Sequence, residues 1–285
     1  MSITAMAAVR TRLRRLKIDS IMEPAPTRYL HIKRQEMHQK LILVTNDDGY
    51  QAQGIQVLAD SMRKLGKVII VAPDAARSGA ACSITPATAV RVSRISDDVY
   101  ACSGTPVDCV KIALEKLLPR TPDLVVSGIN HGDNASVSIH YSGTMGAVFE
   151  ACMKGISAIG YSLRTNKKQC DFSPYVQVVE QWAERVLSEP LREGVCLNIN
   201  FPETQCLKGS MLCRMAKGAW HTEWLDAGTD SQGCRLFTLT GTFCNLEPEA
   251  TDTDLYALEH SMASVTPVDI DMTSRESLSE PGLNF

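Results

Sequence analysis

The feature that most constrains the fold is a regular alternation of short apolar runs with amphipathic helical segments from Leu41 to about residue 200. The apolar runs have the length of strands, and they read "LILVT", "KVIIVAP", "DLVVSGIN", "ISAIGYSL" and "CLNINFP". Between them, segments such as "GIQVLADSMRKLG" and "PYVQVVEQWAERVLSE" carry apolar residues at helical spacing. This alternation is typical of βαβ units that build a parallel sheet. We therefore expect a Rossmann-like, doubly wound, mostly parallel α/β sheet.

The pattern changes after Pro202, where helical periodicity fades and short β-like runs such as "MLCRMAK" and "CRLFTLTG" appear. We therefore predict a catalytic core at residues 37–200 and a smaller, strand-rich C-terminal extension at 201–285. The first 36 residues differ from both, since they hold eight Lys and Arg against three Asp and Glu. Two interpretations stay open for them: a disordered or targeting segment, or a translation start at Met37.

Composition excludes several classes of function. No apolar run reaches the roughly 18–20 residues that a membrane-spanning helix needs, so we expect no membrane association. The whole chain has a net charge of −3 in spite of its basic start, so the remainder is acidic and unsuited to a nucleic-acid polymer. The ten cysteines form no C-x-x-C pair. We interpret them as reduced thiols of a cytoplasmic protein.

Three polar segments follow strands of the predicted sheet: Asn46-Asp47-Asp48-Gly49, "RSG" at 77–79 and "SGINHGDN" at 127–134. In a parallel sheet these connections leave from one edge, so distant segments can converge there. Their carboxylate, hydroxyl and carboxamide oxygens suit Mg²⁺, Mn²⁺ or Ca²⁺ better than Zn²⁺. Two neighbouring carboxylates repel each other when alone but are favourable beside a divalent cation.

A fourth polar segment, Ser142-Gly143-Thr144, stands directly before the predicted helix "TMGAVFEACMKG". Ser and Thr are good N-caps, which is one explanation of the segment. The start of a helix also binds phosphate through its free N–H groups, and both explanations can hold together. No P-loop motif occurs in the chain.

Taken together, "VTNDDGYQAQGI", "APDAARSGAACSIT", "SGTPVDCV", "DLVVSGINHGDN" and "YSGTMGAVFEA" resemble the SurE family of 5′-nucleotidases, from about Leu41 to Asp271. The resemblance implies a metal-dependent phosphatase that acts on nucleoside 5′-monophosphates, and in some members on 3′-monophosphates or short polyphosphate. It implies one Mg²⁺ or Mn²⁺ per subunit, and a homodimer or homotetramer built through the C-terminal extension. Carried over by motif, the metal-binding residues are Asp47, Asp48, Ser78 and Asn130. The residues expected to bind the phosphate or the substrate are Asn46, Ser142, Gly143 and Thr144.

Two positions depart from the family pattern, Cys82 in the second motif and Met262 before "SVTP", and neither is an expected metal ligand. In the mechanism that we predict, Asp47 and Asp48 are catalytic, and one of them orients or deprotonates a metal-activated water. The roles of His131 and His140 stay open. The main alternative is a nucleotide-sensing protein without catalysis, although a pure binder has no evident need for adjacent carboxylates. Two other classes of phosphate-handling protein do not fit the sequence. A two-component receiver needs a phosphoacceptor Asp that this chain lacks, and a haloacid-dehalogenase phosphatase needs an alternating D-x-D motif, whereas the two acids here are adjacent.

Overall fold

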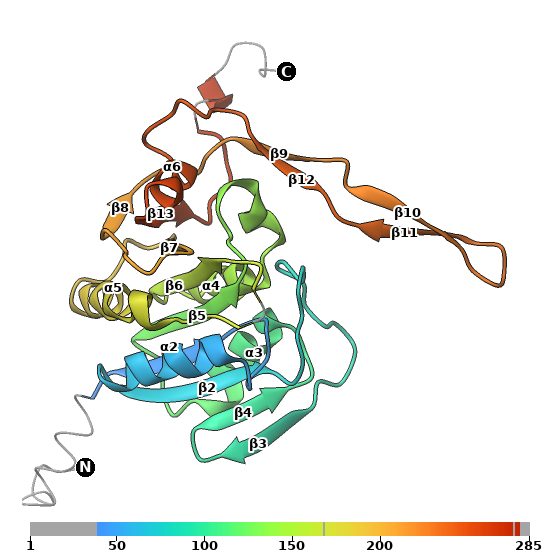
Figure 1. The fold of residues 1–285 in the computed structure, drawn as a ribbon. Helices are drawn as coiled ribbons and strands as arrows, with labels where there is room; N and C mark the ends of the chain where they lie inside the picture. Colours follow the sequence, from blue (N-terminus) through green and yellow to red (C-terminus); the bar gives the residue numbers. More distant parts are fainter. Residues whose placement is uncertain (1–38, 168, 276, 280–285) are drawn as a thin grey trace, which may run out of the picture. The chain divides into compact units, whose positions relative to one another are not determined.

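The computed structural model describes residues 39–167, 169–275 and 277–279. The basic segment 1–36 lies outside these residues, so the expectations about it stay predictions. The described chain alternates strands and helices over most of its length (Figure 1). The strands are β1 (Leu41–Thr45), β2 (Lys67–Pro73), β3 (Val92–Ser96), β4 (Val99–Cys102), β5 (Leu124–His131), β6 (Ala158–Arg164), β7 (Val195–Pro202), β8 (Ser210–Leu212), β9 (Gly218–His221), β10 (Trp224–Thr229), β11 (Arg235–Leu239), β12 (Thr242–Asn245) and β13 (Ala263–Asp269).

The helices follow the expected periodicity. The α-helices are α2 (Gln53–Arg63), α3 (Pro106–Ile112), α4 (Gly143–Met153), α5 (Val176–Ser188) and α6 (Asp254–Glu259). Helix α3 begins with a capping box between Thr105 and Asp108 and continues as a π-helical turn, η2 (Ala113–Leu117). Short 3₁₀ turns complete the set: η3 (Ser136–Tyr141), η4 (Ser173–Tyr175) and η5 (Ser277–Ser279). Among the described residues, no helix is long and apolar enough to span a bilayer.

Nine strands form one sheet in the order β3-β4-β2-β1-β5-β6-β7-β13-β8. The six central strands from β4 to β7 pair in parallel, and the antiparallel pairs β3–β4 and β7–β13 lie toward the edges. Strand β1 lies between β2 and β5, so the chain reverses its direction of growth across the sheet at β1. This is the mostly parallel, doubly wound α/β fold that the sequence predicts.

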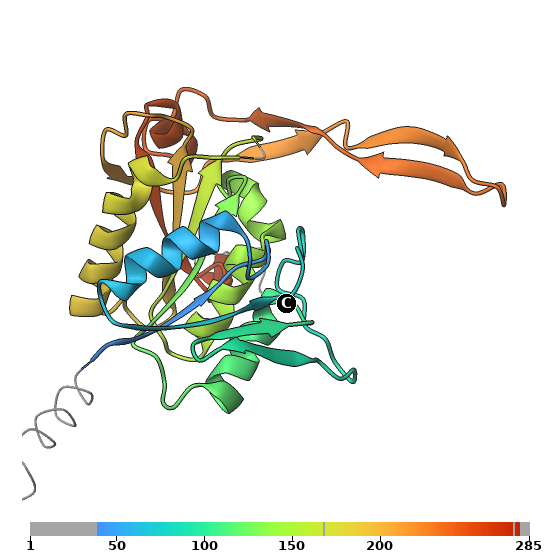
Figure 2. The same ribbon diagram turned by 60° about the horizontal axis from the view of Figure 1, so that its bottom comes forward.

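Helices cover both faces of the sheet, so its central strands are buried on both sides (Figures 1 and 2). Apolar residues of α2 and α5, such as Leu58 and Val179, pack with one side of the strands in one core cluster. Residues of α3 and α4, such as Val110 and Val148, pack with the other side in a second cluster. The two cores hold β1 and β5 rigidly, and the loops at their carboxyl ends inherit that rigidity.

The segment after Pro202 contributes to two different parts of the fold. Strands β8 and β13 and helix α6 complete the main sheet and its cover, with β13 paired to both β7 and β8. Strands β9 and β12 form one antiparallel pair, and β10 and β11 continue it as a second pair that runs away from the sheet (Figure 2). Every residue of β10 and β11 is exposed. The expected strand-rich extension thus serves partly as the edge of the core and partly as a projecting ribbon.

Candidate functional site

The polar segments that follow β1, β2 and β5 come together, as the strand order requires, because these three strands are neighbours in the sheet. The backbone N–H of Arg77 donates to the carbonyl oxygen of Asp47 at 2.7 Å. The backbone N–H of His131 donates to Oδ2 of Asp48 at 3.2 Å. Segments that lie about 30 and 80 residues further along the chain than the Asp pair are therefore attached to it directly.

Asn46 holds the turn that presents the two carboxylates. Its Nδ2 donates to the carbonyl oxygen of Gly49 at 2.9 Å, and its Oδ1 accepts from the N–H of Gly49 at 3.1 Å. Gly49 has a φ of 102°, a conformation that favours glycine. The observed contacts of Asn46 are structural, and the substrate contact expected for this residue stays a prediction.

Asp47 is almost fully buried, with 5% of its surface exposed. Its Oδ1 accepts a hydrogen bond from Oγ1 of Thr144 at 2.5 Å. Gly143 makes this approach possible, since a Cβ atom at that position would lie 2.9 Å from the Cβ of Asp47. Burial raises the pKa of Asp47 to about 6, with a further rise from the charge of Asp48, while the bond from Thr144 acts in the opposite direction.

Asp48 is half-buried, and burial also raises its pKa, against the hydrogen bond from His131. Among the residues that the structure describes, no Lys, Arg or His forms an ion pair with Asp47 or Asp48. The protein therefore removes two adjacent carboxylates partly from water without a direct ion pair from a described residue, and the only charge that acts to lower the pKa of Asp48 is that of His131. This is an unfavourable arrangement for the isolated chain and a favourable one for a bound cation.

The start of α4 faces this pair. Ser142 is the N-cap, and its Oγ accepts from the N–H of Met145 at 3.0 Å, as the capping explanation predicts. The hydroxyl of Thr144 donates a hydrogen bond to Asp47. The N–H of Ser142 donates to the carbonyl oxygen of Ile139, and that of Thr144 hydrogen-bonds Asp47, so the helix start offers an anion the N–H of Gly143 and the positive end of its dipole.

Ser78 lies in the loop after β2 and is exposed. The loop is fixed next to α4. The N–H of Ala81 donates to the carbonyl oxygen of Tyr141, and Gly146 has no side chain that would prevent the loop from packing against α4. A Cβ at Gly146 would stand only 2.1 Å from the carbonyl oxygen of Ala81. Asn130, half-buried at the end of β5, donates from Nδ2 to Gly132 at 2.8 Å, and no described residue donates to its Oδ1.

The two histidines have different environments. The ring of His131 points into the loop after β6, where Nε2 lies 2.7 Å from the carbonyl oxygen of Lys167 and 3.0 Å from Sγ of Cys170. Only its backbone contacts the carboxylate pair. His140 is exposed, and no contact of its side chain is observed. Neither ring is placed by these contacts as a proton donor to a leaving group.

The donor set fits a hard divalent cation. Asp48 retains one carboxylate oxygen and Asn130 its amide oxygen without a donor from the described chain. Directly below the turn, the hydroxyls of Thr45 and Ser127 are buried without a hydrogen-bond partner at paired positions of β1 and β5. No group of three His, Cys, Asp or Glu side chains suited to a metal exists within the described ranges. A cation here would therefore depend on two carboxylates plus neutral oxygens and water, which is the chemistry of Mg²⁺ or Mn²⁺.

Comparisons with known proteins give the family of the chain. The family model described as "Survival protein SurE" matches residues 42–222. The chain is 48% identical to the 5′-nucleotidase SurE of Phocaeicola vulgatus over 244 residues, which cover 84% of this chain and 95% of that protein. It is 43% identical to the 5′-nucleotidase SurE of Bacteroides thetaiotaomicron, over 84% of this chain and 93% of that protein. The crystal structure of the SurE protein from Aquifex aeolicus is similar with a TM-score of 0.74 and 31% identity, covering 84% of this chain and 96% of that one.

Proposed function

This chain belongs to the SurE family, and we propose that it is a 5′-nucleotidase that hydrolyses nucleoside 5′-monophosphates with the help of a divalent cation. The observation that carries the proposal is the Asp47–Asp48 pair, one residue buried and the other half-buried, which forms no ion pair among the described residues and stands beside the start of α4. The names and high coverage of the relatives support the reaction class. A binding protein without catalysis would have no reason to bury two adjacent acids at such a cost.

In the proposed mechanism, Asp47, Asp48, Ser78 and Asn130 hold the cation. When bound, a divalent cation neutralises phosphate charge and acidifies a coordinated water. Asp48, or Asp47 in the reversed assignment, accepts the proton of the attacking water. The expected phosphate site at Ser142, Gly143 and Thr144 acts through the N–H of Gly143 and the positive end of the α4 dipole, which stabilise the charge that develops on the phosphate oxygens. The other two N–H groups are already engaged, because that of Ser142 donates to Ile139 and that of Thr144 to Asp47. The rigid β1 and β5 ends supply the positioning on which phosphoryl transfer depends.

The test is phosphate release by the full-length protein from adenosine 5′-monophosphate, with the 3′-monophosphate and short polyphosphate as comparison substrates. We expect turnover of the 5′-monophosphate with Mg²⁺ or Mn²⁺. A chelator should lower the rate by on the order of 10² or more, because the carboxylate pair then repels the substrate phosphate. Full activity should return when the metal is restored. Undiminished turnover in excess chelator would contradict the proposed metal dependence. Absence of phosphate release under all conditions would contradict the proposed reaction.

We further propose that a second copy of this chain covers the ribbon of β10 and β11, giving the expected homodimer or homotetramer. An isolated two-stranded ribbon is at best marginally stable in water. This one exposes large apolar side chains on both of its faces: Trp224, Leu225, Leu236, Phe237 and Leu239 are between 43% and 62% exposed. Exposed apolar patches of this kind mark interaction surfaces.

Replacing both Trp224 and Phe237 by Ser is expected to reduce the oligomer to a monomer, because the register places the two residues on one face of the ribbon and the change removes its largest apolar groups. Light scattering after size-exclusion chromatography measures the mass. Gln232→Ala, at the exposed tip between the two strands, is the matched control and should leave the mass unchanged. An oligomer that survives the double substitution would show that the ribbon is not the interface.

A further inference from the structure

A large cavity opens beside the candidate site. Its volume is about 790 Å³, within the range of small-molecule pockets, and it lies at the carboxyl ends of β5, β6 and β7. The residues that matter for its chemistry are Gly132, Asp133, Arg164, Glu203, Trp220 and Phe243. The cavity therefore combines charged side chains from the sheet edge with an aromatic wall from the pair β9–β12.

The loop after β5 connects the cavity to the carboxylate pair. The N–H of His131 donates to Asp48, and the next residue, Gly132, lines the cavity. Gly132 also accepts a hydrogen bond from Asn130 through its carbonyl oxygen. The cavity therefore begins two residues along the chain from Asn130, an expected metal ligand. We expect a molecule whose phosphate lies at the carboxylate pair to extend toward this cavity.

The aromatic wall consists of Trp220 on β9 and Phe243 on β12, which are paired residues of the two strands. Their rings meet edge to face, with centroids 5.5 Å apart and an interplanar angle of 71°. Phe243 packs inward on a small apolar cluster with Leu255 and Leu258, whereas Trp220 is 38% exposed. One aromatic residue is thus fixed in the protein and supports the other, whose ring is left accessible.

The polar part of the cavity includes Asp133 and Arg164. Asp133 follows Asn130 by three residues, and its Oδ2 is 3.2 Å from Nε of Arg164. A carboxylate and a guanidinium in this arrangement can accept from and donate to hydroxyl groups. The cavity therefore offers hydroxyl-binding groups and an aromatic wall, the two kinds of contact that the sugar and the base of a nucleotide need.

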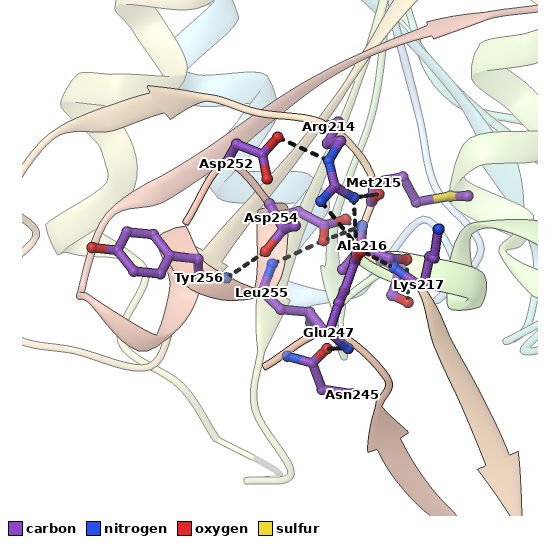
Figure 3. Close-up of polar contacts among 12 residues, drawn as sticks. Arg214, Met215, Ala216, Lys217, Asn245, Glu247, Asp252, Asp254, Leu255 and Tyr256 are labelled. Carbon is purple, nitrogen blue, oxygen red and sulfur yellow. Dashed lines mark hydrogen bonds and ion pairs between the residues drawn. The ribbon is translucent and has the colours of Figure 1, made fainter. Parts of the chain in front are cut away.

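Ion pairs at the root of the ribbon hold the aromatic wall in place (Figure 3). Arg214 pairs with Glu247 and, from its Nε, with Asp252 at 2.9 Å. The N–H of Lys217, next to β9, donates to Glu247 at 2.7 Å. Because both strands of the β9–β12 pair are tied to the same group at their root, Trp220 and Phe243 are held at a fixed position relative to α6.

We propose that this cavity is the nucleoside subsite, in which the base stacks on Trp220 and the sugar lies beside Asp133 and Arg164. The inference rests on the proposed 5′-nucleotidase function and goes further, since it names the residues that distinguish a nucleotide from another phosphate ester. Aromatic stacking recognises every base and is tolerant of its identity. The subsite therefore selects nucleotides as a class and does not read one base.

The test compares adenosine 5′-monophosphate with p-nitrophenyl phosphate, which has neither the sugar nor the base of a nucleotide. For Trp220→Ala we expect the KM for the nucleotide to rise about tenfold, the effect of losing one base-stacking contact, with kcat little changed. The KM for p-nitrophenyl phosphate should stay as in the wild type. Trp220→Phe should restore most of the nucleotide affinity, and Trp220→Leu, which keeps apolar bulk without a flat ring, should not.

Ile95→Ala, an exposed apolar residue on β3 at the far edge of the sheet, is the control and should change neither KM. Equal KM changes for both substrates, or none for Trp220→Ala, would overturn the subsite. If Trp220→Ala changed the mass of the oligomer, the cavity would belong to a subunit interface, and this result would also overturn the nucleoside subsite. If the wild type hydrolyses neither substrate, the proposed function itself fails, and that result is distinct from the others.

Discussion

Asp47→Asn is expected to lower kcat for adenosine 5′-monophosphate by on the order of 10²–10³. An amide keeps the size of the side chain and can still accept a hydrogen bond from Thr144, so the turn should stay folded. It removes one of the two negative charges that attract the cation, and it cannot accept a proton at neutral pH. The loss should therefore appear in the rate and in metal affinity, with the fold intact.

The same substitution is expected to stabilise the protein in chelator. The pKa of Asp47 is raised to about 6 from an ordinary value of 3.8, so above pH 6 its ionisation costs the folded state about 2–3 kcal/mol. Asn carries no such cost, and the variant should exceed the wild type in stability by up to this amount at pH 7.5. As the pH falls from 6 to 4, the wild type takes up the proton in the folded state first, and the difference should disappear.

Urea unfolding at several pH values, with and without Mn²⁺, measures both effects. Asp97→Asn is the matched control, since the side chain of Asp97 is 95% exposed, and it should change neither the rate nor the pH dependence. Wild-type turnover in Asp47→Asn would remove the proposed mechanism. A less stable Asp47→Asn in chelator would show that the buried charge is compensated by a group that the observed contacts do not include.

The fold could be predicted because local pattern and global architecture agree. "LILVT" and "KVIIVAP" are buried along almost their full length, as continuous apolar runs in a parallel sheet should be. The convergence of Asp48 and His131 followed from the same logic, since strands that emerge at one edge bring their loops together. The fold class and the meeting of these segments were therefore accessible from the sequence.

The detailed roles were not accessible, because they depend on contacts between residues far apart in the chain. Asn46 occupies a polar strand end like its neighbours, yet its side chain holds the turn. Thr144 contributes to the site through a hydrogen bond to Asp47, across 97 positions. Trp220 and Phe243 stand in short β-like runs without a motif, and only the register of β9 with β12 places them together.

Asp254→Ala is expected to destabilise the protein by on the order of 3–5 kcal/mol, the largest stability effect that we predict. Asp254 is fully buried, and its Oδ2 accepts from the N–H of Ser136 at 2.8 Å. Its Oδ1 accepts from the N–H groups of Ala216 and Leu255 at 3.0 and 2.8 Å. All three donors lie in buried residues, so alanine would leave each N–H unpaired away from water. Figure 3 shows the carboxylate at the junction of α6 with the ribbon root.

Asp254→Asn separates the hydrogen bonds from the charge. Burial raises the pKa of Asp254, so the ionised carboxylate destabilises the folded state in a way that the neutral amide does not. Asn also retains one acceptor oxygen. We therefore expect Asn to cost clearly less than Ala in urea unfolding at pH 7.5. Asp252→Ala, which removes an exposed partner of Arg214 in the same network, should cost at most about 1 kcal/mol. If Asp254→Ala were no worse than this control, the junction would not hold the ribbon, and the aromatic wall of the cavity would need another support.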